Sequence, residues 1–322
     1  MTSKEKIAPL VQQLITARSA ELAQHENEIW HLSRPLLRLV HAEEEDYSTL
    51  GNCRIGGTPN LPKDMDYPVK NGKYYRFIGQ LNFAELPDTL EILPEKGILF
   101  LFCGDPFENE SHCIYYDAAA ELENKQPPLD MECLDPYQEE YGDFVVHKIA
   151  FELSYQIGWS EDLEDFELAE EPTDKPFNTH IGGTAFGTDM EGLYALLKGF
   201  DTLRNTVLFL EEPDQETYWL PQKRGLVAQM EDQINNPEKY NTESSTINIA
   251  AVKESLRQLL AFDENRAEHR KYFKDVFCLF SLESRDEFNM WWSDHGFLNF
   301  YMLKEDLVKR NFGNVVVEVA SS

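Results

Sequence analysis

The feature that most constrains the fold of this chain is a pattern that occurs twice. The first copy contains the segments Arg54-Ile-Gly-Gly-Thr58, Phe77-Ile-Gly-Gln-Leu-Asn-Phe83 and Gly97-Ile-Leu-Phe-Leu-Phe-Cys103. The second contains, in the same order, His180-Ile-Gly-Gly-Thr184, Phe277-Cys-Leu-Phe-Ser-Leu-Glu283 and Gly296-Phe-Leu-Asn-Phe-Tyr-Met302. A glycine turn followed by two apolar strands therefore recurs, which predicts an internal duplication.

The spacing of these strands indicates the fold class. Short strands without a regular alternation of strand and helix argue against a doubly wound parallel sheet, so we expect an α+β fold with mainly antiparallel pairing. Each copy is too small to bury both of its faces. We therefore predict one domain over 1–322, in which a first repeat (51–151) and a second repeat (178–322) share one core and are flanked by helices.

The chain begins with a helix signal. Thr2 and Glu5 have the spacing of a capping box, and apolar residues then recur at helical spacing, which predicts an N-terminal helix within 1–24 whose apolar side packs on the core.

The second copy carries three further helix signals. Residues from about 190 to 275 form a mostly helical insertion, Ser284 and Glu287 predict a capping box that opens a short helix with two tryptophans, and a last helix near 304–310 precedes an edge strand over 315–320.

Charge narrows the choice of partners. The 322 residues include 29 Lys and Arg against 58 Asp and Glu, a formal net charge of −29. This excess repels phosphate backbones and anionic lipids, so no nucleic-acid or membrane partner is expected, whereas a basic protein or peptide would be attracted. The oligomeric state is left open.

The cysteines and the apolar segments bear on the compartment. Five cysteines form an odd set without a C-x-x-C pair, which argues against a disulfide framework. The first residues lack a signal-peptide pattern, and no stretch of 18 uncharged apolar residues occurs. A cytoplasmic location is the prediction.

The two glycine turns are the first candidate ligand site. Consecutive glycines allow left-handed backbone conformations, and they can also aim several N–H groups at an anion. Because neither turn matches a phosphate-binding motif, a tight turn that begins each repeat is the simpler interpretation. The candidate residues are Gly56, Gly57 and Thr58 in the first copy and Gly182, Gly183 and Thr184 in the second.

Gln80 is a second candidate. In the alignment of the two copies it corresponds to Ser281, and its amide could face a ligand or bridge the repeats.

A third candidate lies before the last repeated strand. Trp291, Trp292, Asp294 and His295 combine aromatic rings with a carboxylate, which suits a basic, partly apolar peptide through cation–π contacts and charge pairing. Core tryptophans with a solvated rim would give the same pattern.

Motifs for chemistry are not found. Cys103, His112, Cys113 and Cys133 lack the paired spacing of zinc ligands, and the sequence has no G-x-S-x-G or H-E-x-x-H motif. No catalytic residue, metal or cofactor is therefore assigned. Acidic runs at 43–46 and 161–171 are expected to be solvated loops or contacts for a basic client.

The sequence contains IGGTPNLP at 55–62, Tyr67-Pro68, FIGQLNFAELP at 77–87, LPEKGILFLF at 93–102 and Asp294-His-Gly-Phe-Leu-Asn-Phe-Tyr301 with Lys304-Glu-Asp306. These motifs resemble the YwqG-like family, which is built around a bacterial domain of unknown function. The chain departs from the pattern at Ser281, where the second repeat of the family carries Gln, and at Ala185, where a proline-like turn is expected.

The resemblance implies an α+β fold with internal duplication and no established activity. It also implies distant kinship with eukaryotic ribosome-assembly factors of the programmed-cell-death-protein-2 type, which escort a basic ribosomal protein, and a link to bacterial toxin genes. The leading hypothesis is a non-enzymatic acidic protein that binds a basic polypeptide, either a client or a toxin. The alternative is an enzyme or small-molecule receptor with a pocket between the repeats near Gly57, Gln80, Gly183 and His295.

Overall fold

The computed structural model describes most of the chain. The described residues are 2–18, 22–87, 90–117, 121–138, 142–158, 163, 177–183, 193–194, 197–198, 215–241, 246–264 and 275–320. They divide into two compact units, Met1–Gly187 with Phe277–Ser322, and Thr188–Val276.

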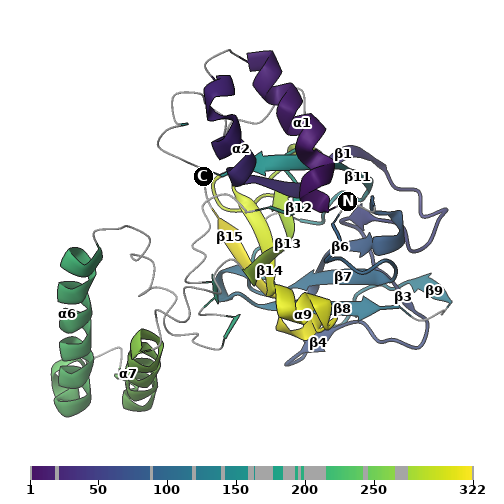
Figure 1. The fold of residues 1–322 in the computed structure, drawn as a ribbon. Coiled ribbons are helices and arrows are strands. Elements are labelled where there is room, and N and C mark those ends of the chain that lie inside the picture. Colours follow the sequence, from purple (N-terminus) through teal and green to yellow (C-terminus); the bar gives the residue numbers. More distant parts are fainter. Residues whose placement is uncertain are drawn as a thin grey trace. The chain divides into compact units, whose positions relative to one another are not determined.

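The first unit is organised around one ten-stranded sheet (Figure 1). Its strands, in spatial order, are β15 (Val316–Ala320), β14 (Phe297–Leu303), β13 (Val276–Glu283), β12 (His180–Gly182), β1 (Ser33–Glu44), β11 (His147–Ile157), β2 (Arg54–Ile55), β6 (Arg76–Asn82), β7 (Ile98–Cys103) and β8 (Ser111–Tyr116). The pairings with a recorded register in this sheet are antiparallel, and helices flank it. The predicted α+β class is confirmed.

Two small sheets and several short helices complete this unit. The small sheets are β10 (Glu132–Cys133) with β5 (Lys73–Tyr74) and β4 (Val69–Lys70), and β3 (Asn60–Pro62) with β9 (Leu122–Asn124). The short helices are α2 (Glu26–Leu32), α9 (Lys304–Val308) and the 3-10 helices η1 (Leu22–His25), η2 (Phe83–Glu85), η3 (Pro106–Glu108), η8 (Asp286–Phe288) and η9 (Phe312–Asn314).

Strands β1 and β11 lie in the middle of the ten-stranded sheet. β1 and β11 pair along their whole length, and β12 joins β1 on one side while β2 joins β11 on the other. Outward from this central pair run β2–β6–β7–β8, which we call the first half, and β12–β13–β14–β15, which we call the second half. The two halves therefore follow the same order of pairing, whereas the duplication itself stays a prediction.

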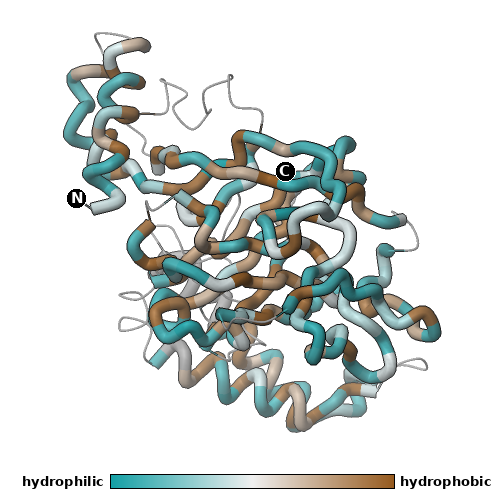
Figure 2. Tube along the Cα trace, turned by 90° about the vertical axis from the view of Figure 1, so that its right-hand side faces the viewer, coloured by the Kyte–Doolittle hydropathy of each residue, from teal (hydrophilic) through white to brown (hydrophobic). Residues whose placement is uncertain are grey.

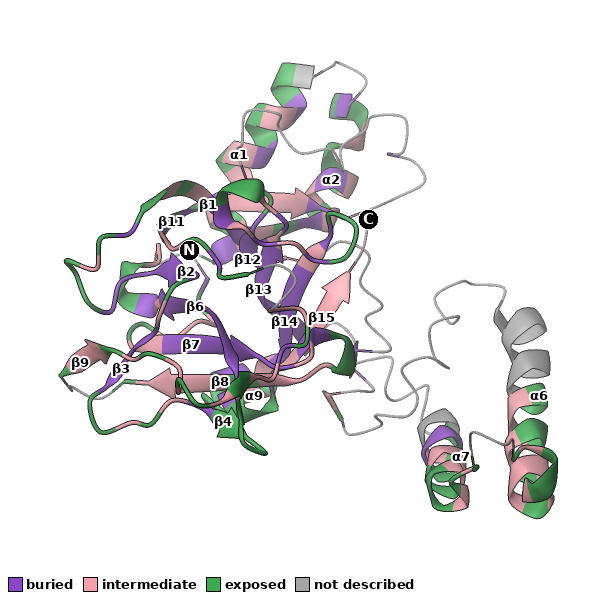
Figure 3. Ribbon diagram, turned by 180° about the vertical axis from the view of Figure 1, so that it is seen from behind, coloured by how far each residue is buried: buried purple, intermediate pink, exposed green. Residues whose placement is uncertain are grey.

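Both halves contribute side chains to one hydrophobic core. A single cluster of buried side chains includes Leu37 and Phe151 of the central pair, Ile55, Leu81 and Leu101 of the first half, and Leu279, Phe300 and Val317 of the second. Figure 2 shows hydrophobic and hydrophilic segments interspersed along the chain, and Figure 3 shows β6, β7, β13 and β14 as mostly buried.

Strand β7 is covered on both faces, which its unbroken apolar run predicts. Leu99 and Leu101 belong to the main core. Phe100 and Phe102, which point to the opposite face, belong to a separate cluster with Tyr75.

The N-terminal helix is shorter than predicted but is capped and packed as predicted. α1 (Ser3–Arg18) ends before residue 24, and Leu22 belongs to η1 instead. The capping box is present, because the backbone N–H of Thr2 donates to Glu5 Oε2 at 2.7 Å and that of Glu5 donates to Thr2 Oγ1 at 3.2 Å. Ile7 is fully buried in a cluster that also includes Ile157 of β11.

The second capping box is wrong. Ser284 does not cap a helix, because its Oγ accepts from the backbone N–H of Trp292 at 2.8 Å and donates to Gly296 O at 2.9 Å. Arg285 and Met290 form an isolated β-bridge around η8, so the segment is a tight loop and the two tryptophans lie outside any helix.

The described part of the second unit contains two helices and a 3-10 turn. α6 (Gln215–Asn235) and α7 (Ile249–Glu264) pack against each other, with η6 (Pro237–Lys239) after α6. Most of the acidic run at 161–171 lies outside the described residues.

Candidate functional site

The glycine turns have the backbone that their sequence requires. Gly56 and Gly57 both have φ of +67°, and Gly182 and Gly183 have +83° and +66°. A β-carbon on Gly56 would lie 2.7 Å from the carbonyl oxygen of Val145, so the turn depends on glycine for space as well as for φ. Gly56 donates its N–H to Ile78 O at 2.8 Å, which fits the simpler interpretation as a turn. Thr184 lies outside the described residues.

Gln80 is fully buried and its amide is hydrogen-bonded within the first half. Its Nε2 donates to Asn52 O at 2.8 Å and to Asn60 Oδ1 at 3.1 Å. Its Oε1 accepts from the Asn60 N–H at 2.9 Å and from Arg54 at 3.3 Å. The amide therefore ties three segments of the first half together.

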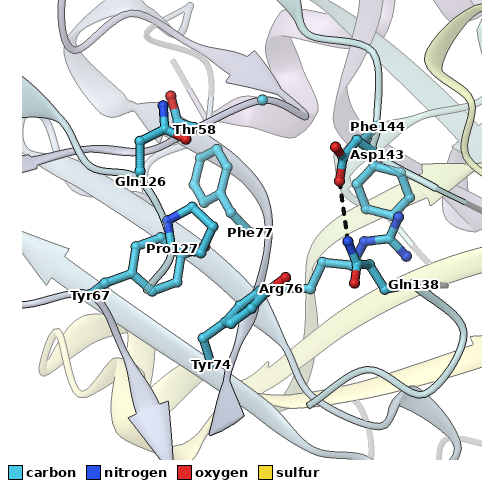
Figure 4. Close-up of a pocket in the computed structure, with 11 residues that line it drawn as sticks. Thr58, Tyr67, Tyr74, Arg76, Phe77, Gln126, Pro127, Gln138, Asp143 and Phe144 are labelled. Atoms are coloured by element: carbon cyan, nitrogen blue, oxygen red, sulfur yellow. Dashed lines mark hydrogen bonds between the residues drawn. The ribbon is translucent and has the colours of Figure 1, made fainter. Parts of the chain in front are cut away.

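One pocket opens beside the first glycine turn (Figure 4). It has a volume of about 190 Å³. Its lining consists of Gly57, Thr58, Tyr67, Tyr74, Arg76, Phe77, Gln126, Pro127, Gln138, Asp143 and Phe144, and we call it the aromatic pocket. Gly57 and Thr58 are the predicted site residues in this lining, whereas Gln80, Gly183 and His295 are not part of it.

Arg76 is held firmly in the wall of this pocket. Its NH1 lies 2.9 Å from Asp135 Oδ2 in a buried ion pair, and its NH2 donates to Gly142 O. The guanidinium carbon lies 3.4 Å from the centre of the Phe144 ring. Both terminal nitrogens and one face of this cation are therefore already in contact with protein groups, and Asp135 balances its charge.

The other polar groups of the aromatic pocket are neutral apart from Asp143. The exposed Asp143 carboxylate accepts from Gln138 Nε2 at 3.2 Å. Burial raises the pKa of Tyr67, and burial, Cys133 and Asp143 raise the pKa of Tyr74, so both phenols are uncharged at neutral pH. Around a compensated arginine, the pocket offers aromatic faces, amides and one carboxylate.

A second, smaller pocket shares Arg76 as a wall. It has a volume of about 50 Å³ and is lined by Arg76, Pro106, Phe107, Asp135, Tyr137, Trp291, Trp292, Ser293 and Val319. We call it the tryptophan slot. The structure thus brings Trp291 and Trp292 into one lining, whereas a peptide site at these residues stays a prediction.

Asp294 and His295 lie outside this lining and are exposed. The His295 ring lies 4.8 Å from that of Trp291 in an edge-on contact.

Sequence reasoning missed most of the aromatic pocket. Tyr67, Tyr74, Gln126, Gln138 and Asp143 come from loops and two-residue strands without periodicity. The signal that could have found the site is the arginine between Tyr75 and Phe77 at the start of a strand, because a buried arginine needs a partner for its charge.

Other kinds of site are not found among the described residues. In that part of the chain, no three His, Cys, Asp or Glu side chains gather as metal ligands. All five cysteines are free. The helices in the described ranges include none that is both long and apolar enough to cross a membrane.

With its antiparallel pairings in a ten-stranded sheet and its flanking helices, the chain is an α+β protein. It belongs to the family described as Domain of unknown function (DUF1963), whose model matches residues 53–320. A search of the curated proteins finds no match. The matched range begins after β1, although β1 lies at the centre of the sheet.

Proposed function

We propose that this protein binds a basic segment of a polypeptide, a client or a toxin, on the surface that carries the aromatic pocket and the tryptophan slot. The net charge of −29 supports this class of partner, because it favours the approach of a cationic chain. The protein needs no catalytic group for this role.

The observation that carries the proposal is the state of Arg76. Since its terminal nitrogens contact Asp135 and Gly142 and its face contacts Phe144, it is poorly placed to clamp an incoming anion. Asp143 is the other charged residue of the lining. A cation that enters meets aromatic faces and a carboxylate, which are the groups that stabilise ammonium and guanidinium ions.

Two exposed apolar residues are close in sequence to the lining. Val145 follows the lining residue Phe144 and is 44% exposed, and Leu129, two residues after Pro127, is 100% exposed. Both are open to contact with a polypeptide partner.

Pocket size argues for this proposal over a small-molecule receptor. Sites for drug-sized ligands usually measure about 300–1,000 Å³, whereas the two pockets measure about 190 and 50 Å³. Such volumes suit single side chains of a longer chain. An enzyme or receptor with a pocket between the repeats remains the competing proposal.

Calorimetric titration with a peptide rich in arginine and lysine, and with an acidic peptide of equal length, tests the proposal. We expect binding of the basic peptide alone, and weaker binding as salt rises. Asp143→Asn should weaken binding about fivefold, the equivalent of roughly 1 kcal/mol for one lost charge contact.

The matched control is Glu152→Gln, which removes the same charge from an exposed position on β11. It should change the affinity less than twofold. Equal losses for the two variants would reduce the effect to general charge, and binding of neither peptide would overturn the proposal.

A further inference from the structure

Trp292 lines the tryptophan slot and carries a buried hydrogen-bond donor that has no acceptor in the described part of the chain. Trp292 is 5% exposed, and its Nε1–H has no hydrogen-bond partner among the described residues. A buried donor without an acceptor is unfavourable, and an acceptor supplied by a ligand that lies against Trp292 would satisfy it.

Trp292 is fixed by contacts of its backbone and of its ring. The backbone N–H of Trp292 donates to Ser284 Oγ at 2.8 Å, and the centre of the indole ring lies 5.6 Å from that of Phe144 in an edge-on contact. Phe144 in turn lies against Arg76 and lines the aromatic pocket. Trp292, Phe144 and Arg76 therefore form a row of side chains in contact that connects the two pockets.

The mouth of the slot is aromatic and accessible. Phe107 is 48% exposed, and its ring lies 5.3 Å from that of Tyr137. At about 50 Å³ the slot has room for one small apolar group. Aromatic walls beside a tryptophan N–H are what proline-containing segments need, because the proline ring packs flat on aromatic faces and the neighbouring carbonyl projects as an acceptor.

We propose that the tryptophan slot receives a proline of the bound basic segment, and that Trp292 Nε1–H donates to the backbone carbonyl beside that proline. This inference rests on the proposed function, since charge complementarity brings the basic segment to the shared Arg76 wall. The recognised chemistry is then a cationic side chain and a proline in one extended segment.

The test compares a basic peptide that contains prolines with the same peptide in which alanine replaces each proline. We expect the proline peptide to bind about tenfold more tightly to the full-length protein. Trp292→Phe keeps an aromatic ring but removes the N–H, and it should abolish most of that preference. Asp143→Asn should weaken both peptides alike.

A spectroscopic readout follows the donor directly. The indole N–H resonance that is lost in Trp292→Phe should shift downfield with the proline peptide and stay in place with the alanine peptide. Trp292→Phe shortens a side chain of the hydrophobic core, so we expect a lower unfolding temperature, and the peptides are compared at a temperature where the variant is folded.

The outcomes separate the two proposals. If both basic peptides bind equally and the resonance does not move, the slot proposal is overturned while the proposed function stands. If neither peptide binds, the proposed function fails. A resonance that moves equally with both peptides would also contradict a site for proline.

Discussion

The two halves of the sheet use the same pairing positions for different polar groups. In the first half Arg54 of β2 is paired with Gln80 of β6, and in the second half His180 of β12 is paired with Ser281 of β13. The backbone order is matched on both sides of the central β1–β11 pair. The side chains at these matched positions share polarity but neither charge nor size.

The polar groups at these positions differ in the contacts that they make. Arg54 is fully buried, donates to Gln80 and lies 4.6 Å from the centre of the Tyr47 ring, while its Nε and NH1 have no partner among the described residues. Ser281 donates to Asn299 Oδ1 at 2.7 Å. The same strand order therefore tolerates different buried polar residues. It buries a permanent cation, Arg54, in the first half and a titratable side chain, His180, in the second.

The largest expected effect distinguishes the two networks. Gln80→Ala removes four hydrogen bonds and leaves the buried Arg54 guanidinium without its side-chain acceptor, so we expect a loss of about 4 kcal/mol in the free energy of unfolding. Ser281→Ala removes the hydrogen bond to Asn299 and should cost about 1 kcal/mol. Urea unfolding measures the free energy of unfolding of both variants. Equal losses would contradict the stronger network that we assign to Gln80.

The glycine turns give the second contrast. Gly56→Ala places a methyl group 2.7 Å from a backbone oxygen at positive φ, whereas Gly182→Ala meets the flexible end of Leu90 at 3.1 Å. Strain at positive φ costs about 1–2 kcal/mol in each variant, and the backbone clash should raise the Gly56→Ala loss to about 3 kcal/mol. Thermal unfolding checks this order. A larger loss for Gly182→Ala would contradict the described packing.

The third contrast is in pH dependence. Burial, with a smaller effect from Arg38, lowers the pKa of His180 to about 4, although its Nδ1 contacts Asn178 O at 2.7 Å. Burial lowers the pKa of Arg54 to about 10, so that group stays charged throughout acidic and neutral pH.

The sign follows from proton linkage. Above pH 6.5 His180 is neutral in both states and contributes no pH dependence. Between about pH 6.5 and 4, His180 is protonated in the unfolded chain but stays neutral in the native state. The free energy of unfolding should therefore fall by about 3 kcal/mol over this range.

Other groups titrate in this range, so a difference between variants isolates the effect. His180→Gln should lose less stability than the parent protein between pH 7 and pH 4.5, whereas Arg54→Gln should show the parent dependence on pH. A parallel pH profile for His180→Gln would show that His180 is not the titrating group.

Much of the fold could be predicted because strand patterns are local. The apolar runs over 77–83, 98–103 and 277–283 correspond to β6, β7 and β13, and the strand expected over 315–320 is β15 at the sheet edge. Strand β1 escaped prediction because Pro35 and Arg38 interrupt its apolar pattern. Arg38 is 1% exposed and donates to Phe177 O at 3.3 Å, a contact across 139 positions that the local sequence does not reveal.

The site was less predictable for the same reason. The tryptophans and the first glycine turn were identified from composition and repetition, and both line pockets. Tyr67, Gln126 and Asp143 meet only after the small sheets and the loop before β11 have folded. Their separation in sequence, over more than 70 positions, leaves no spacing that marks them as one site.

The proposed function places a basic segment on the first half of the sheet and on the loop at 291–293, which carries Trp291 and Trp292. Hydrogen–deuterium exchange with and without the basic proline peptide tests it most directly. We predict slower exchange at 74–77, 142–146 and 291–293, and unchanged exchange at the matched second-half segment 180–183. Protection confined to 180–183, or no protection at saturating peptide, would contradict the account.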